Sequence, residues 1–323
     1  MPIIENSSYR AKGIARNPHV STLRANAFRA VPKMGYVRER IPTEDGDFLD
    51  LDWIRSGNEK ALVLSHGLAG DSSRVYMRGM AKYFHDREWD ICAWNFRGCS
   101  GEPNLTEAYY HPAQVGDLGA VVDRVLAGSR YAQVALVGFS MGGVLTLNYL
   151  ARAKSELPRE LLGACCISTP CDMYSTVGRL SNRPGKIYGK IFLSQFKKRM
   201  REKEKAMPGT YDLDKLKTVR TLYDFDRVYN APWYGYADIG EFYEYMDPRP
   251  FLDRVEIPSL VVNARNDPFM DDGSYPKDVA ARSKYIHLEI PDHGGHMGFG
   301  KSGLKDGNWA EARAHDFLSA LLA

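Results

Sequence analysis

One short motif in the chain could carry covalent chemistry, Gly138-Phe139-Ser140-Met141-Gly142. A Gly-x-Ser-x-Gly pattern between an apolar strand (133–138) and an apolar helix predicts a sharp turn that exposes the serine hydroxyl. The glycines let the strand and helix approach without a clash of Cβ atoms. The positive end of the helix dipole suits a developing negative charge. Ser140 is therefore the candidate nucleophile, and the alternative is an ordinary tight turn.

A second group of residues, His66-Gly67-Leu68-Ala69-Gly70, follows an earlier apolar run (61–65). A His-Gly pair in this place commonly shapes one wall of an oxyanion hole, the site that holds a negatively charged substrate oxygen. We expect the backbone N–H groups of Leu68 and Met141 to form that hole. His66 and Gly67 are expected to support the loop, and the alternative for His66 is a general base.

A serine nucleophile needs an imidazole to accept its proton and a carboxylate to orient that imidazole, in the chain order serine, acid, histidine. Asp267 lies just beyond an apolar run (259–264), where the acid is expected. The alternative is an ordinary Asx-turn before Pro268. Asp271 and Asp272 are the local competitors for the role of acid.

The base is expected in a glycine-rich loop after the last apolar run (285–290). His296 lies among glycines that permit a tight loop, so we favour it over His293, which we expect to brace the turn. The remaining histidines lie outside this group and are expected to be structural: His19, His85, His111, His287 and His315.

The sequence predicts neither a metal site nor a cofactor. It contains no HExxH motif, no spaced Cys/His cluster, no EF-hand loop, and no GxGxxG that opens a helix after a strand. Five scattered cysteines without a CxxC pair indicate reduced thiols: Cys92, Cys99, Cys165, Cys166 and Cys171. The N-terminal residues lack the apolar stretch of a secretory signal, so we expect a cytoplasmic protein.

Composition excludes several other classes of protein. The 323 residues are 44% hydrophobic and 26% charged, as in soluble globular proteins, and Lys plus Arg exceed Asp plus Glu by only three. That balance gives no electrostatic reason to expect a nucleic-acid partner. The apolar segment 132–151 is long enough to span a membrane, but its central glycines favour strand, turn and helix. The sequence makes no prediction about oligomeric state.

Short apolar runs alternate with amphipathic stretches, which predicts a mostly parallel sheet covered by helices on both faces. We expect a hairpin over 36–41 and 47–54. Core strands are predicted at 61–65, 91–95, 133–138, 163–168, 259–264 and 285–290, and helices at 73–85, 115–126, 141–153 and 309–322.

The alternation stops after residue 168 and resumes near residue 257, which predicts a core of 1–168 and 257–323 with an inserted lid, 169–256. Nine aromatic residues in 223–245 suggest either a lid over an apolar pocket or packing of the insertion onto the core. The basic stretch 186–205 has helical spacing. It predicts one apolar stripe, made by Ile187, Ile191, Phe192 and Phe196.

The chain resembles the α/β-hydrolase superfamily and, within it, the YheT-like group, whose relatives include embryogenesis-associated proteins and α/β-hydrolase-domain lipases. The strings that carry the resemblance are Asn17-Pro18-His19, Asp45-Gly46-Asp47-Phe48-Leu49-Asp50-Leu51-Asp52-Trp53, His66-Gly67-Leu68, Asn95-Phe96-Arg97-Gly98, the serine motif, Asn266-Asp267-Pro268-Phe269 and Gly295-His296-Met297-Gly298-Phe299. The resemblance implies that Ser140, Asp267 and His296 are charge-relay residues and that the activity is serine ester hydrolysis. Several eukaryotic relatives carry an N-terminal membrane anchor, which we do not expect here.

Our leading hypothesis is a serine hydrolase that cleaves small-molecule acyl esters of short to medium chain length through an acyl-enzyme. The alternatives are an acyltransferase, a lipid-directed lipase or phospholipase, and a non-catalytic binding protein on the same scaffold. For the segment 186–205 we expect a lid helix packed on the domain with a solvated basic end. Peripheral docking on an anionic membrane is the alternative.

Overall fold

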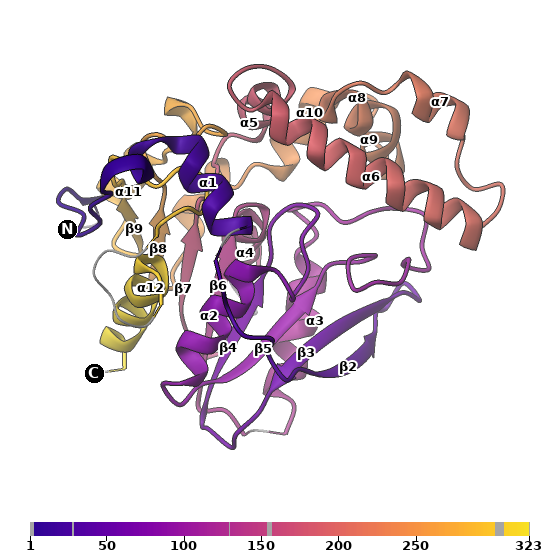
Figure 1. The fold of residues 1–323 in the computed structure, drawn as a ribbon. Coiled ribbons are helices and arrows are strands. Elements are labelled where there is room, and N and C mark those ends of the chain that lie inside the picture. The colour runs from indigo at the N-terminus through magenta and orange to yellow at the C-terminus, as the bar shows by residue number, and fades with distance from the viewer. Residues whose placement is uncertain (1–2, 28, 129, 154–156, 301–306, 323) are drawn as a thin grey trace.

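The structure is a computed structural model that describes residues 3–27, 29–128, 130–153, 157–300 and 307–322. Its centre is a nine-stranded sheet in the order β1-β9-β8-β7-β6-β4-β5-β3-β2 (Figure 1). The strands are β1 (Ile3–Ile4), β2 (Val37–Pro42), β3 (Phe48–Ile54), β4 (Lys60–Ser65), β5 (Asp90–Asn95), β6 (Gln133–Phe139), β7 (Leu161–Ile167), β8 (Ser259–Val262) and β9 (Ile286–Glu289). Only β3 runs antiparallel to its neighbours β2 and β5. The predicted hairpin and core strands are confirmed, whereas β1 was not predicted.

Helices cover both faces of the sheet, as predicted (Figure 1). One face packs against α2 (Val75–His85) and α12 (Trp309–Ala320), and the other against α3 (Val115–Leu126), α4 (Met141–Arg152) and α11 (Lys277–Arg282). Within β7, Ala164 and Cys166 enter one apolar cluster, while Cys165 and Ile167 enter the other. This alternation makes the strand apolar along its whole length and buried on both sides.

The chain between β7 and β8 is helical and lies above the carboxyl ends of the parallel strands (Figure 1). It holds α5 (Met173–Ser181), α6 (Lys186–Ala206), α7 (Leu213–Thr218), α8 (Leu222–Phe225), the π-helix η3 (Asp226–Asn230), α9 (Ala231–Trp233), α10 (Ile239–Met246) and the 3-10 helix η4 (Arg249–Arg254). Aromatic contacts hold this helical segment together and attach it to the loop that follows β5. The Phe196 and Phe225 rings stack with centroids 5.1 Å apart, and the Trp233 ring lies 5.8 Å from that of Tyr109, in the loop after β5.

Three further elements complete the described chain: the 3-10 helices η1 (Gly13–Arg16) and η5 (Asp272–Ser274), and α1 (Pro18–Ala27). The Asn17 side chain begins α1 by accepting hydrogen bonds from the N–H groups of His19 and Val20. Across the described ranges, every helix is too short or too polar to cross a lipid bilayer. The apolar segment 132–151 forms β6 and α4, as predicted.

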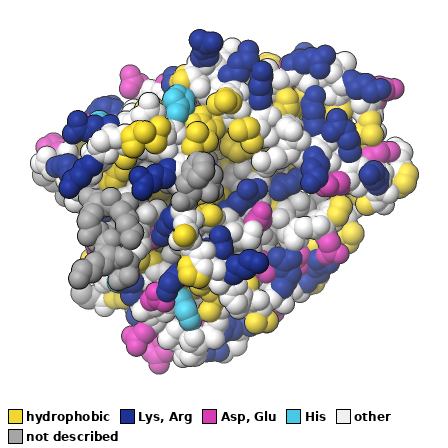
Figure 2. Space-filling model, viewed as in Figure 1, with side chains coloured by type: hydrophobic (Ala, Val, Ile, Leu, Met, Phe, Trp, Pro, Cys, Tyr) yellow, Lys and Arg dark blue, Asp and Glu magenta, His cyan; other side chains and the backbone are white. Residues whose placement is uncertain are grey.

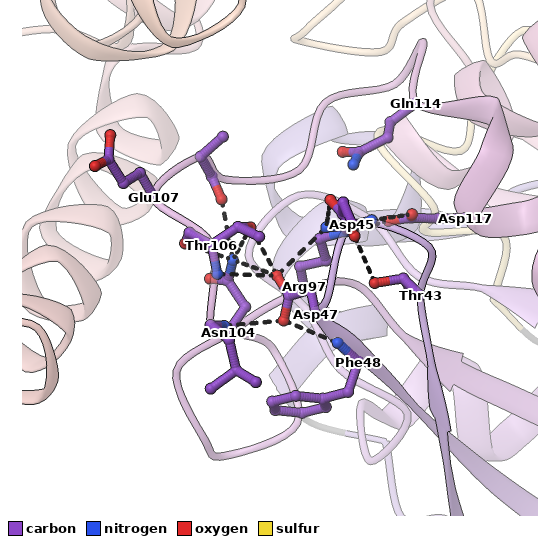
Figure 3. Close-up of polar contacts among 12 residues, drawn as sticks. Thr43, Asp45, Asp47, Phe48, Arg97, Asn104, Thr106, Glu107, Gln114 and Asp117 are labelled. Carbon is purple, nitrogen blue, oxygen red and sulfur yellow. Dashed lines mark hydrogen bonds and ion pairs between the residues drawn. The ribbon is translucent and has the colours of Figure 1, made fainter.

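A buried ionic network anchors the loop that follows β5 (Figure 3). Arg97 in this loop lies 2.7 Å from the Asp117 carboxylate of α3 and 3.3 Å from Asp47, just before β3. Asn104 donates a hydrogen bond to Asp47 over 2.9 Å. The buried Arg97 guanidinium is thus paired with carboxylates from both sides, so the network ties the loop to α3 and to the start of β3.

Cross-strand ion pairs stabilise the hairpin at one edge of the sheet. Arg38 faces Asp52, and Arg40 faces Asp50, in the register of β2 and β3. In each pair the arginine Nε lies 2.8 Å from the carboxylate. Opposite charges placed directly across two strands add to the stability of the pairing.

Candidate active site

Ser140 lies between β6 and α4 with φ 53° and ψ −119°, a backbone conformation that L-residues rarely adopt. The neighbouring glycines are required by close backbone contacts. A Cβ on Gly138 would lie 2.4 Å from the Gly142 oxygen, and a Cβ on Gly142 would lie 2.3 Å from the Ser65 oxygen. The turn therefore holds Ser140 at the carboxyl end of the sheet, as a strand-to-helix serine motif requires.

His296 and Asp267 complete a hydrogen-bonded chain with Ser140. The His296 Nε2 atom is 2.9 Å from the Ser140 Oγ, and its Nδ1 atom is 2.7 Å from the Asp267 Oδ2. The other Asp267 oxygen accepts a hydrogen bond from the Phe269 N–H over 2.8 Å. Both side chains are buried, and the Phe269 ring lies against the imidazole with a centroid separation of 4.0 Å. The three side chains follow β6, β8 and β9, whose carboxyl ends share one edge of the sheet.

The competing residues lie elsewhere. Asp271 caps η5 by accepting a hydrogen bond from the Gly273 N–H. Asp272 is the first residue of η5. No hydrogen bond joins the His293 side chain to Ser140, and among the described residues its buried Nδ1 atom has no hydrogen-bond partner.

The His66 ring forms its hydrogen bonds with the neighbouring loops and not with Ser140. Its Nδ1 atom is 2.8 Å from the Gly67 oxygen, and its Nε2 atom accepts a hydrogen bond from the Phe96 N–H over 3.1 Å. Complete burial lowers the pKa of His66 to about 4, so the ring is neutral near pH 7. A neutral ring that donates through Nδ1 and accepts through Nε2 matches both contacts.

Other side chains hold the loop through its backbone groups. The Gly67 N–H donates to the Tyr76 hydroxyl over 3.0 Å, and the Ala69 N–H donates to the Tyr110 hydroxyl over 2.9 Å. The Ala69 oxygen accepts hydrogen bonds from Arg74 and, over 3.3 Å, from Arg199 of α6. The helical segment between β7 and β8 therefore contacts this loop directly through Arg199.

Among the residues that the structure describes, two N–H groups beside Ser140 remain free. The backbone N–H groups of Leu68 and Met141 have no acceptor within the described ranges. A Cβ added to Gly67 would lie 3.3 Å from the Ser140 Cβ, so the loop packs directly against the serine. Fixed, unpaired N–H groups beside a nucleophile can hold an oxygen that gains negative charge.

A family model for the α/β hydrolase fold matches residues 60–302, which is most of the chain. The chain belongs to the α/β-hydrolase family. This α/β-hydrolase is 31% identical over 313 residues to YheT of Escherichia coli (strain K12), a protein named as an esterase. That match covers 95% of our chain and 91% of YheT. The predicted resemblance to the YheT-like group is thereby confirmed.

Two other relatives and a solved structure agree with this membership. The α/β-hydrolase is 28% identical to phospholipase ABHD3 of Mus musculus, over 83% of this chain and 67% of that protein. It is 25% identical to the embryogenesis-associated protein EMB8 of Picea glauca, over 97% and 72%. The Pyrococcus furiosus esterase Pf2001 has the same fold, with a TM-score of 0.59, 17% identity, and coverage of 93% of this chain and 98% of that one.

Three contacts around His296 of the α/β-hydrolase were not predicted from the sequence. The His296 N–H donates to the Thr22 Oγ1 of α1 over 2.9 Å, and the Met297 N–H donates to the Ser168 Oγ over 2.8 Å. The Asn266 side chain accepts a hydrogen bond from the Gly295 N–H. The string Asn17-Pro18-His19 does signal a helix start. Nothing local shows that the helix reaches a loop 274 positions away.

A cavity of about 180 Å³ opens beside Ser140 of the α/β-hydrolase. Its apolar wall comes from α6, α1 and the loop after β8, through Leu23, Tyr188, Ile191, Phe192 and Phe269. None of the nine aromatic residues of 223–245 is among the described residues that line it. Trp233 and Tyr234 instead pack against Tyr109 and His111 in the loop after β5, and α6 supplies the pocket wall.

No ligand set for a metal occurs in the described ranges, where no cluster of three His, Cys, Asp or Glu side chains is found. All five cysteines are buried free thiols. Burial raises the pKa of each cysteine thiol, so these thiols are poor nucleophiles at neutral pH.

Proposed function

We propose that this α/β-hydrolase is a serine carboxylic-ester hydrolase with Ser140 as nucleophile, His296 as general base and Asp267 as the group that orients His296. The observation that carries the proposal is the hydrogen-bonded chain of 2.9 Å and 2.7 Å that joins the three side chains. Relatives named as esterase and phospholipase support the same reaction class.

The proposed reaction has two halves. The Ser140 oxygen attacks the ester carbonyl while its proton moves to the His296 Nε2, and the carbonyl oxygen accepts hydrogen bonds from the Leu68 and Met141 N–H groups. The carbon–oxygen bond to the leaving group then breaks, and the departing alkoxide takes the proton from His296. Water, deprotonated by His296, attacks the acyl-enzyme and releases the carboxylic acid and free Ser140.

The pocket supports substrates with a short to medium acyl chain. Its volume of about 180 Å³ lies below the roughly 300–1,000 Å³ of pockets that enclose drug-sized ligands. A short acyl group would therefore fill the enclosed part, and the rest of a larger ester would lie at the mouth.

An acyltransferase would use the same residues with an alcohol in place of water, so products formed with and without added alcohol separate the two reactions.

Activity against p-nitrophenyl esters of graded acyl length tests the proposal. We expect Ser140→Ala to lower kcat on the order of 10⁴–10⁶-fold, because triad enzymes lose about that much without their nucleophile. Ser194→Ala, on the exposed face of α6, is the matched control and should keep full activity. A fluorophosphonate probe should label the wild type and spare Ser140→Ala. Substantial activity in Ser140→Ala would refute the assignment.

We also propose a cytoplasmic location. Free thiols persist mainly in reducing compartments, and all five cysteines are free. Fractionation of cells that express the full chain tests this location.

A further inference from the structure

Three large apolar side chains lie exposed beside the mouth of the Ser140 pocket. Leu23 of α1 is 47% exposed, and Ile187 and Ile191 of α6 are 64% and 46% exposed. We call these three residues the mouth patch. Leu23 and Ile191 also line the pocket, and Ile187 lies one helical turn before Ile191. Figure 2 shows hydrophobic side chains gathered over α1 and the start of α6, with Lys and Arg side chains beside them.

The mouth patch corrects the predicted single apolar stripe on residues 186–205. Tyr188 and Phe196 are buried and Phe192 is partly buried, so these rings face the domain. Ile187 and Ile191 each lie one residue before a ring of that row. One residue corresponds to a rotation of about 100° around the helix, so these two side chains face outward. The helix therefore has one apolar row for the core and a second row that the described residues leave uncovered.

The position of the patch distinguishes it from ordinary surface residues. Single exposed apolar side chains are normal on proteins. Apolar side chains grouped around the entrance of a pocket are typical of a surface that binds a partner or a membrane.

The two segments that carry the mouth patch are basic in sequence. Residues 6–27, which include α1, contain four Lys or Arg and no Asp or Glu. Residues 173–201, which include most of α6, contain eight Lys or Arg and no Asp or Glu. Arg24, Arg183, Lys186 and Lys190 are exposed among them. Apolar side chains within a basic surface match an anionic lipid layer, whose headgroups attract the cations while the apolar side chains enter the acyl boundary.

We propose that the mouth patch and the basic side chains beside it dock the protein on an anionic phospholipid surface, so that a lipid ester passes from that surface to Ser140. This inference rests on the proposed ester hydrolysis and names a lipid-borne ester as the substrate. Docking through this face places the pocket mouth against the lipid, because Leu23 and Ile191 belong to both.

Co-sedimentation of the full chain with vesicles tests the docking without any catalysis. The protein carries Ser140→Ala, so that vesicles are not hydrolysed. The vesicles contain phosphatidylcholine alone or phosphatidylcholine with phosphatidylglycerol, at low and high salt. We expect binding to anionic vesicles at low salt, at least about tenfold above binding to neutral ones, and a loss of binding as salt screens the charges.

Two pairs of variants locate the contact. Lys186→Glu/Lys190→Glu should weaken vesicle binding by about 25-fold or more, since each basic residue near a lipid surface contributes about fivefold. The charge-matched control is Lys277→Glu/Lys284→Glu. Lys277 lies on α11 and Lys284 follows it, and this variant should bind vesicles as well as the Ser140→Ala protein does. Ile187→Ser should weaken binding severalfold, whereas Val37→Ser, 69% exposed on β2, should not.

The docking proposal is overturned if the protein binds neutral and anionic vesicles equally at low salt, or if it binds neither. The mouth patch would then be a site for a protein partner. The docking proposal is also overturned if the patch variants and the control variants lose vesicle binding to the same extent. A second readout is the ratio of hydrolysis rates for an ester held in anionic vesicles and a soluble p-nitrophenyl ester, which should fall in Lys186→Glu/Lys190→Glu. Activity that survives Ser140→Ala would overturn the proposed function alone, because the vesicle-binding result does not depend on it.

Discussion

His296 joins the two other side chains of the proposed triad, because its ring nitrogens reach Ser140 and Asp267, and its backbone N–H is held by Thr22. The sequence contains the signals for the three side chains, since each follows an apolar strand and parallel strands end at one edge of the sheet. It contains no signal for Thr22 or Ser168. A hydrogen bond between segments far apart in the chain produces no local pattern, so these supports could not be predicted.

The two histidines of the last loop provide a sharp test. We expect His296→Ala to lower kcat about as far as Ser140→Ala, because no other described base contacts the Ser140 hydroxyl. His293→Ala should keep most of the activity, because no hydrogen bond joins His293 to Ser140. Both variants are compared by kcat for a p-nitrophenyl ester, after circular dichroism confirms that each is folded. The reverse pattern would exchange the roles of the two residues.

At the scale of elements, the loop 67–70 depends on parts of the chain that lie outside it. Tyr110 comes from the loop that the Arg97 network anchors, and Arg199 comes from α6. The sequence predicts the apolar strands and amphipathic helices well, because their periodicity is local. It predicts the faces of α6 poorly, because Ile191 and Phe192 are adjacent in sequence but point to different sides.

Tyr110→Phe tests whether the loop contact matters for the reaction. The change removes the acceptor of the Ala69 N–H, and an unpaired buried N–H costs about 1–3 kcal/mol. If the loop shifts to recover a partner, the Leu68 N–H moves too, so we expect kcat to fall about tenfold or more with little change in KM.

Tyr109→Phe is the matched control. Its buried hydroxyl has no partner among the described residues, so removing that hydroxyl should leave kcat unchanged. Equal kcat values for the two variants would show that the Tyr110 contact does not position the loop.

At the scale of the whole molecule, two buried histidines link stability to pH. Burial lowers the pKa of His66 to about 4 and that of His111 to about 3, with the charge of Arg152 adding to the second shift. In the unfolded chain an ordinary histidine titrates near pH 6.5. The unfolded state therefore binds more protons below that pH, and the free energy of unfolding falls as the pH drops from about 6.5 toward 4.

The substitution His111→Asn isolates the contribution of one of these two histidines to the pH dependence of stability. Asp226 and Asp247, whose pKa values burial raises to about 6, act in the opposite direction, so the wild type and the variant must be compared at both pH values. We expect the drop in unfolding free energy between pH 7 and pH 5, measured by urea titration, to be about 2 kcal/mol smaller in His111→Asn. The same drop in both proteins would contradict the buried, neutral state of His111.

The hairpin at the edge of the sheet also affects how copies of the protein behave when they are crowded together. A free strand edge exposes N–H and C=O groups that can pair with another chain and start aggregation. On β2, Arg38 and Arg40 extend from the strand into ion pairs, and Pro42 has no N–H to donate. A second chain approaching this edge would have to remove water from those charges. The charged hairpin therefore disfavours fibre-like growth of the sheet from one molecule to the next at high protein concentration.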